Sequence, residues 1–133
     1  MSQENVETLR QALEAFNRRD KAAWIAVVDP EAENFPPMAW PENAPIRGPE
    51  AIWNFYVEAV NAWEEGEFEW GEFIDAGKEV VVANQLRHMR GKTSGAAVEW
   101  SYWVVFEFRD GKVVRTRWFA ERDAALEDAG LSE

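Results

Sequence analysis

The first third of the chain has apolar residues at the spacing of amphipathic helices. In residues 2–20, charged positions separate the apolar ones, which are Val6, Leu9, Leu13 and Phe16. This spacing predicts a helix with one buried face. Asp20 is a suitable N-cap for a second, shorter helix that ends before Pro30, because the residue preceding a proline disfavours helical backbone angles. Pro49 marks the start of a third helix, which runs to residue 63.

Prolines dominate the segment between the second and third helices. Residues 31–50 hold five of the six prolines of the chain. This composition predicts a short edge strand followed by a long loop. Trp40 lies in that loop, where it could cover the mouth of a cavity or simply anchor the loop by being buried.

The second half of the chain alternates between apolar and polar residues, as β-strands do. The pattern predicts strands at about 67–74 and 79–90, then two long strands on either side of Asp110-Gly111, the strongest hairpin signal in the chain. A final helix is predicted at 123–129, with Asp123 as its cap and Gly130 just past its end. Helices followed by meandering strands predict an α+β domain with the helices on one face of the sheet.

Both faces of the last two strands carry apolar residues. One face must pack on the helices, and the other has too much ring surface to remain in water. We therefore predict a homodimer through this second face. Its residues are Trp103, Val105, Val114, Thr116 and Trp118.

Composition narrows the classes of function. A chain of 133 residues with 47% hydrophobic residues predicts a single domain, 1–133, with one core. Its formal net charge of −11 argues against nucleic acid or an anionic membrane as a partner. The chain has no cysteine, which excludes disulfides and thiolate chemistry. The first residues lack the features of a signal peptide, and no apolar run approaches about 18 residues, so a cytoplasmic protein is expected.

Four segments, in this order, resemble the SnoaL-like polyketide cyclase family of the nuclear-transport-factor-2-like superfamily. They are "ETLRQALEAFNRRD", "IRGPEAIWNFY", "FIDAGKEVVV" and "FEFRDGKVVRTRWFAERDAALEDAGL". The resemblance covers nearly the whole chain. It implies a cone, in which a strongly curved, mostly antiparallel sheet wraps around three N-terminal helices and a short C-terminal helix follows. It also implies a pocket at the wide end of the cone. Because the superfamily contains cyclases, isomerases and non-catalytic binding domains, the fold leaves the function open.

Two residues are candidates for proton transfer. In the cyclases that the chain resembles, an aspartate near the end of the last strand is the acid/base. The corresponding position here is Glu121, counted back from Gly130. His88 shares a strand face with Val82 and is expected to face the cone as a second base. The alternatives are a peripheral Glu121 in a surface ion pair and an exposed or hydrogen-bonded His88.

Aromatic and polar residues on the predicted inner surface are candidates for substrate binding, although aromatic residues in small domains more often belong to the core than to a binding site. The set consists of Trp24, Trp40, Trp53, Tyr56, Asn84, Trp100, Tyr102, Arg117 and Phe119. No cofactor and no metal site are expected, because one histidine and no cysteine make a poor ligand set. The sequence thus predicts a cofactor-independent protein that binds a hydrophobic, cyclic small molecule, with acid/base catalysis of the cyclase, hydratase or isomerase type. The alternative is a non-catalytic ligand-binding or dimerisation module.

Overall fold

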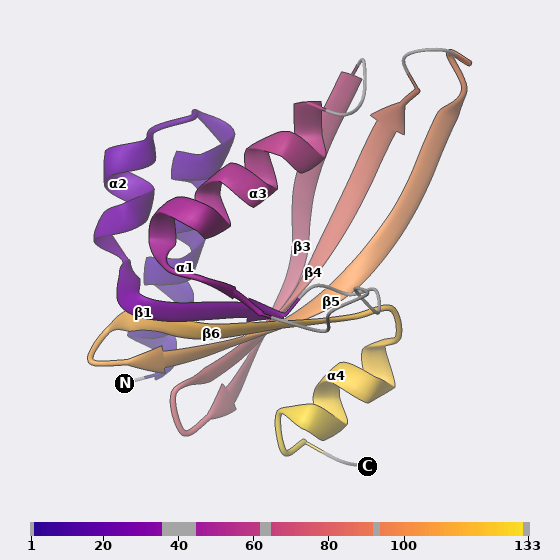
Figure 1. The fold of residues 1–133 in the computed structure, drawn as a ribbon. Helices are drawn as coiled ribbons and strands as arrows, with labels where there is room; N and C mark the ends of the chain where they lie inside the picture. The colour runs from indigo at the N-terminus through magenta and orange to yellow at the C-terminus, as the bar shows by residue number, and fades with distance from the viewer. Residues whose placement is uncertain (1, 36–44, 62–64, 92–93, 132–133) are drawn as a thin grey trace.

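Three helices lie together on one face of a curved sheet (Figure 1). The computed structural model describes residues 2–35, 45–61, 65–91 and 94–131. The helices are α1 (Ser2–Asn17), α2 (Lys21–Ala26) and α3 (Pro49–Asn61). The predicted cap of α2 is confirmed, since the side chain of Asp20 accepts a hydrogen bond from the backbone N–H of Ala23 at 3.2 Å. No helix in the described ranges has the length and apolar character needed to cross a membrane.

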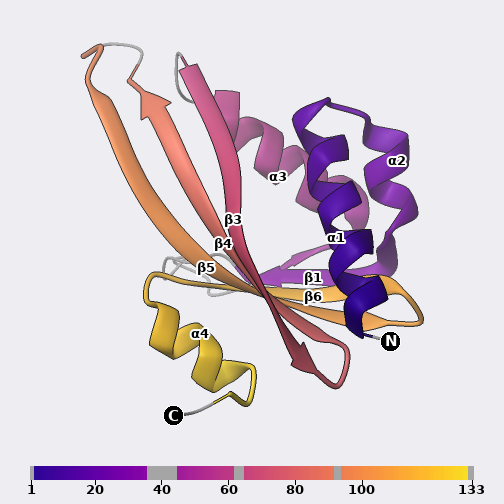
Figure 2. The same cartoon turned by 180° about the vertical axis from the view of Figure 1, so that it is seen from behind.

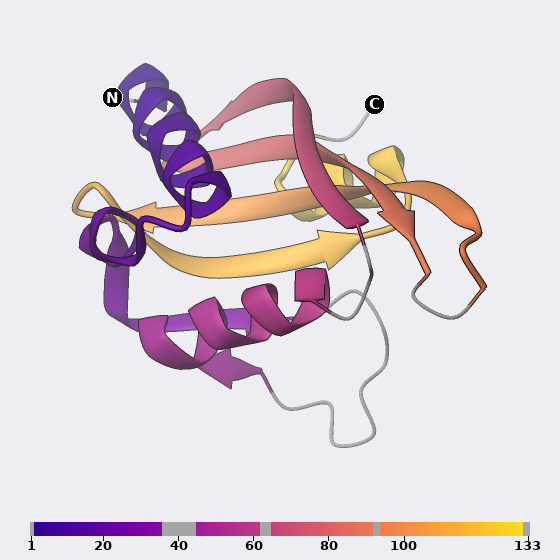
Figure 3. The same ribbon diagram turned by 90° about the horizontal axis from the view of Figure 1, so that it is seen from above.

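The described strands form one mixed sheet in the order β2-β1-β6-β5-β4-β3. Their bounds are Val28–Phe35 (β1), Ile46–Arg47 (β2), Glu65–Gly77 (β3), Val80–Arg90 (β4), Ala97–Arg109 (β5) and Lys112–Phe119 (β6). Neighbouring strands are antiparallel except β1 and β6, which are parallel. The sheet curls around the helices, as the view from above shows (Figure 3). The prediction of an edge strand after α2 is wrong, because β1 lies between β2 and β6.

A fourth helix, α4 (Arg122–Asp128), covers the opposite face of the sheet (Figure 2). Ala125 and Leu126 of α4 pack against Val82 of β4 and Val105 of β5, all of them buried. The predicted cap Asp123 is wrong: Glu121 occupies the N-cap position, and its side chain makes no capping hydrogen bond. Gly130 follows the helix with a φ of 89°, as predicted for a C-terminal glycine. We call the face toward α1–α3 the cone face, and the face toward α4 the outer face.

The hairpin between β5 and β6 confirms the turn signal and adds a bulge. Asp110 and Gly111 have φ values of 54° and 79°, the left-handed pair that such a two-residue turn requires. The register between the two strands then shifts next to Phe108, which pairs with Val113, whereas the preceding Glu107 pairs with Arg115. A bulge of this kind breaks the alternation of faces along the strand. Side chains on β6 therefore do not follow simple odd and even parity.

The surface predicted for a homodimer does not exist as one face. Thr116 and Trp118 are buried on the cone face, while Trp103 and Val105 lie on the outer face in the cluster with α4. The fifth member, Val114, sits at the bulge and is half-buried. The apolar area that suggested a partner subunit is thus shared between the interior of the cone and α4.

Candidate ligand-binding site

An apolar cavity of about 40 Å³ lies between the helices and the cone face of the sheet. Its wall includes Trp24, Tyr56 and Trp118, together with aliphatic residues of α1 and β1. The sheet contributes two polar side chains to this wall, Gln85 from β4 and Thr116 from β6. A space of this size holds a few water molecules. The cavity is therefore a narrow, ring-lined slot.

A buried asparagine joins two of the cavity rings. Asn34 of β1 is fully buried, and its Oδ1 accepts hydrogen bonds from the Tyr56 hydroxyl at 2.7 Å and from Trp118 Nε1 at 2.8 Å. Its Nδ2 group has no hydrogen-bond partner among the described residues. Burial raises the pKa of the Tyr56 phenol above its ordinary value, so the hydroxyl keeps its proton and remains a donor. The amide therefore fixes both rings while presenting an unused donor of its own.

At one end of the cone, β3, β4 and β5 extend past the helices (Figure 1). We call this the wide end. The Trp118 ring lies edge-on to Tyr56, with centroids 6.0 Å apart, and to Tyr102 of β5, with centroids 5.8 Å apart. Edge-to-face contacts of this kind hold rings in defined orientations. The slot therefore continues into a surface formed by the rings of Trp118 and Tyr102, which we call the aromatic wall.

Arg87 of β4 lies against that wall. Its guanidinium carbon is 4.9 Å from the centroid of the Tyr102 ring and 5.3 Å from that of Trp118. Its Nε donates a hydrogen bond to Oε1 of Gln85 at 2.6 Å. The side chain is half-buried, and this burial lowers the pKa of Arg87 from its usual value. A cation is therefore built into the aromatic surface of the cone.

Several predicted binding residues lie in or beside the cavity. Trp24 and Tyr56 line it, and Tyr102 belongs to the aromatic wall. Trp53 lies behind the cavity wall, where the centroid of its ring is 5.2 Å from that of Phe16 and 5.4 Å from that of Trp24. Trp40 and the side chain of Trp100 lie outside the described residues.

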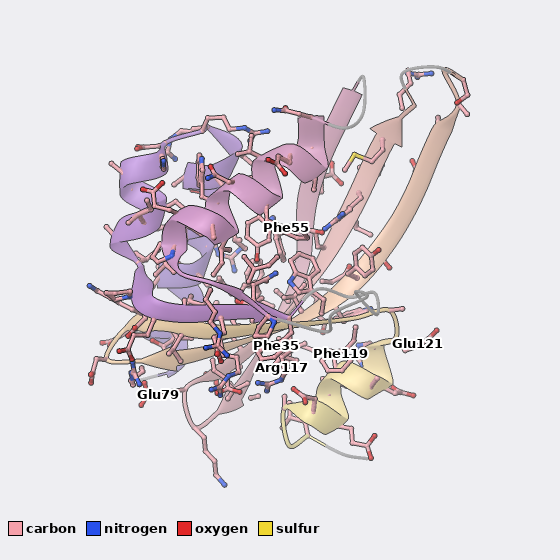
Figure 4. All side chains as sticks on the ribbon, in the orientation of Figure 1. Phe35, Phe55, Glu79, Arg117, Phe119 and Glu121 are labelled. Carbon is pink, nitrogen blue, oxygen red and sulfur yellow. The ribbon has the colours of Figure 1, made fainter. Side chains whose placement is uncertain are left out.

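The residues predicted to carry charge into the cone point the other way. Figure 4 shows Arg117 and Phe119 on the α4 side of the sheet, and Glu121 at the start of α4, directed outward. Arg117 forms ion pairs with Glu107 and with Asp128 of α4, the latter at 2.7 Å. Phe119 packs in the cluster beneath α4, and Glu121 is exposed. Their predicted orientation is wrong because the bulge in β6 puts Val113 on the cone face and these residues on the outer face.

The predicted inward orientation of His88 and Asn84 is also wrong. His88 is half-buried on the outer face, where Nδ1 lies 3.0 Å from Glu99 Oε2 and Nε2 lies 3.2 Å from Glu69 Oε1. These carboxylates raise the pKa of His88, the larger effect coming from Glu99. Asn84 donates from Nδ2 to the backbone oxygen of Tyr102 at 3.1 Å. Val81, Ala83 and Gln85, which alternate with this set along β4, face the cone instead. The apolar Val82 suggested the opposite orientation, but it is α4 that buries Val82 on the outer face.

Sequence reasoning missed the polar residues of the site. Asn34 fell in a segment interpreted as edge strand and loop, and Gln85 and Arg87 alternate with the apolar set that was assigned to the cone. The sequence did contain a signal for this face: Val81, Ala83 and Met89 occupy the same alternate positions as the two polar residues, so they form a second apolar set that could face the cone. Among the described residues, no group of three or more histidines and carboxylates could hold a metal ion.

Comparison with known proteins matches this geometry to one family. The profile of the SnoaL-like domain family matches residues 9–116. An NTF2-like protein from Burkholderia xenovorans is 25% identical, with 97% of each chain covered and a TM-score of 0.73. TerC, crystallised with polyporic acid, is 19% identical over 96% of this chain and 98% of its own, also with a TM-score of 0.73.

A third solved structure is a Mycobacterium tuberculosis protein in complex with estradiol-17β-hemisuccinate. It is 13% identical, covers 90% of this chain and 95% of its own, and has a TM-score of 0.71. A comparison of the sequence with curated proteins found no significant match. The family profile spans most of the chain, and the structures share its architecture. The chain therefore belongs to the SnoaL-like domain family and has the cone-shaped NTF2-like fold that its sequence motifs predicted.

Proposed function

We propose that this protein binds a hydrophobic, ring-containing small molecule in the cone, without proton-transfer chemistry. The observation that carries the proposal is the continuous aromatic surface formed by Tyr56, Trp118 and Tyr102 at the cavity. Apolar pockets with a few convergent polar groups are the usual form of small-molecule sites. The ligands of TerC and of the M. tuberculosis protein, polyporic acid and a steroid ester, support this class of ligand by analogy.

The size of the cavity limits the ligand. A space of about 40 Å³ is much smaller than the clefts that enclose drug-sized molecules. The ligand therefore inserts one ring at most into the slot, and the rest of it lies along the aromatic wall toward the wide end.

Binding without catalysis is favoured by the positions of the titratable groups. The two residues predicted to transfer protons lie on the outer side of the sheet, where Glu121 is exposed and His88 is half-buried. The described cavity wall contains no aspartate, glutamate or histidine. General acid/base catalysis requires such a group within hydrogen-bonding reach of the substrate.

Isothermal titration with a neutral two-ring compound, acetylnaphthalene, tests the proposal. We expect saturable binding of one molecule per chain, and weaker binding to the variant Tyr102→Leu because it removes one ring of the aromatic wall. The matched control is Trp103→Phe, which changes the neighbouring ring on the outer face and should leave the affinity unchanged. The absence of saturable binding up to the solubility limit, or an equal loss in both variants, would refute the proposal.

A further inference from the structure

One of the two polar side chains of the slot is almost fully buried and has an unused donor. Gln85 is 1% exposed, and it lines the slot. Among the described residues, its side chain makes one hydrogen bond, in which Arg87 Nε donates to Oε1 at 2.6 Å. The amide nitrogen Nε2 carries two N–H groups, and no described residue accepts a hydrogen bond from either of them. The apolar wall of the slot therefore contains a donor that the protein itself does not use.

The hydrogen bond with Arg87 fixes the orientation of the amide. The oxygen and nitrogen of a glutamine side chain are nearly identical in shape, so the hydrogen-bonding partners decide which is which. A guanidinium nitrogen donates and does not accept, so the atom that faces Arg87 Nε is the amide oxygen. Arg87 thus occupies the acceptor of Gln85 and leaves Nε2 as the other end of the amide.

Gln85 lies where the slot meets the aromatic wall. In the sheet it pairs with Trp70 of β3 on one side and with Tyr102 of β5 on the other. Trp70 lines the slot, and Tyr102 belongs to the aromatic wall. Side chains that pair directly across neighbouring strands lie on the same face, about 5 Å apart at their Cβ atoms. A planar ligand that crosses this row therefore meets the amide between two rings.

Packing alone does not explain an amide at this point. Burying an N–H group without an acceptor is unfavourable, and a leucine or methionine would fill the space without that cost. Holding Arg87 does not require an amide either, because a glutamate would bind the guanidinium through a stronger, charge-assisted hydrogen bond. A ligand that displaces water from Nε2 loses affinity unless it supplies an acceptor of its own. The amide is therefore useful when the bound molecule carries such an acceptor.

We infer that Gln85 selects the ligand by donating a hydrogen bond from Nε2 to a carbonyl oxygen next to the inserted ring. The inference rests on the proposed function and narrows it from ring compounds in general to ring compounds with a carbonyl group. The described wall of the slot contains no charged side chain. A neutral donor in an apolar wall suits a neutral carbonyl, since a carboxylate would lose its hydration there without gaining a cation.

A matched pair of probes tests the inference. Acetylnaphthalene and ethylnaphthalene share the same rings and nearly the same shape, but only the ketone has an acceptor. Because the two compounds differ in hydrophobicity, the quantity to compare between variants is the ratio of their affinities. In isothermal titration, we expect this ratio to favour the ketone about tenfold more in the wild type than in Gln85→Met. An unchanged ratio would overturn the inference and leave the proposed function standing. If neither compound binds to the wild type, both are overturned.

A second substitution separates the donor from the contact with Arg87. Gln85→Glu keeps an acceptor for the guanidinium and removes the N–H groups, so it should lose the preference for the ketone as Gln85→Met does. The control Asn84→Ala removes the neighbouring amide on the outer face, which donates to the backbone oxygen of Tyr102 at 3.1 Å, and should keep the preference. A preference retained in Gln85→Glu would overturn the inference. Should circular dichroism show that Gln85→Met does not fold, Gln85→Glu provides the test.

Infrared spectra of the bound ketone locate the donor. A hydrogen bond to the carbonyl oxygen lowers its stretching frequency relative to that in an apolar solvent. We expect this lowering in the complex with the wild type and its loss in the complex with Gln85→Met. Thr116, the other polar side chain of the slot, is the alternative donor. A lowered frequency that persists in Gln85→Met and disappears in Thr116→Val would overturn the inference.

Discussion

At the scale of single residues, Asn34 organises the interior of the cone. One buried amide oxygen accepts two hydrogen bonds, from the hydroxyl of Tyr56 on α3 and the indole N–H of Trp118 on β6. The three residues come from three elements, so this small polar group ties a helix to two strands. Because an unpaired buried donor costs more than an average hydrogen bond provides, the interaction is a sensitive point for stability.

Asn34→Ala should therefore destabilise the fold strongly. It leaves two buried donors without an acceptor, and we expect the free energy of unfolding to fall by about 2–4 kcal/mol. The control is Asn84→Ala, which removes one hydrogen bond on the outer face and should cost about 1 kcal/mol. Urea unfolding followed by circular dichroism gives both values, and similar losses in the two variants would contradict the prediction.

His88 should make stability depend on pH. Glu99 and Glu69 raise its pKa in the folded state above the value of about 6.5 found in unfolded chains. The protonated imidazole therefore favours folding, and this contribution is complete below about pH 6.5 and is lost as the pH rises through the folded-state pKa. We expect the melting temperature of the wild type to exceed that of His88→Gln by a larger margin at about pH 5.5 than at about pH 9. A margin that does not change with pH would show that the carboxylates leave the imidazole unperturbed.

At the scale of elements, α4 decides how the two faces of the sheet are used. Its residues Ala125 and Leu126 bury Val82 and Val105, and its Asp128 pairs with Arg117 of β6. The outer face therefore needs apolar residues where α4 lies and charged residues beside it. This explains why an arginine and a phenylalanine share the outer side of β6.

Leu126→Ala tests the contribution of α4. Leu126 is 9% exposed, and truncating such a side chain typically costs about 2–3 kcal/mol of unfolding free energy. The neighbouring exposed residue provides the control, since Glu127→Ala should change stability by no more than about 0.5 kcal/mol. Denaturant unfolding of both variants measures the difference. If Leu126→Ala were as stable as the control, α4 would not be a packed part of the fold.

At the scale of the whole molecule, local sequence signals predicted where the helices and strands lie. Packing between distant parts of the chain decided which face of each strand points into the cone. Asp20 and Asp110-Gly111 act within a few residues of the chain, so their cap and turn could be predicted from sequence. The burial of Val82 by α4 depends on partners distant in sequence, and the bulge opposite Phe108 interrupts the alternation of faces along β6. For that reason the rings Trp24 and Tyr56 were found in advance, whereas His88 was assigned to the wrong face.

Homodimerisation remains a prediction at this scale, although the surface first assigned to it is divided between two faces. If the prediction is right, sedimentation equilibrium of the full chain should give twice the chain mass of 15.3 kDa. The measurement should be repeated over a range of protein concentrations, because dimers dissociate on dilution. A mass of one chain throughout that range would contradict the prediction.

The parallel pairing of β1 with β6 has a consequence for how the chain acquires its structure. Val28 pairs with Val113, and Phe35 with Arg117, so within the sheet β1 is joined to β6 through residues about eighty positions apart. Contacts this distant in sequence slow folding, because a long loop must close before they form. During synthesis, α1, α2, α3 and β1 leave the ribosome long before β6 is made. Until β6 arrives, the surface that becomes the inside of the cone stays open to water and to chaperones.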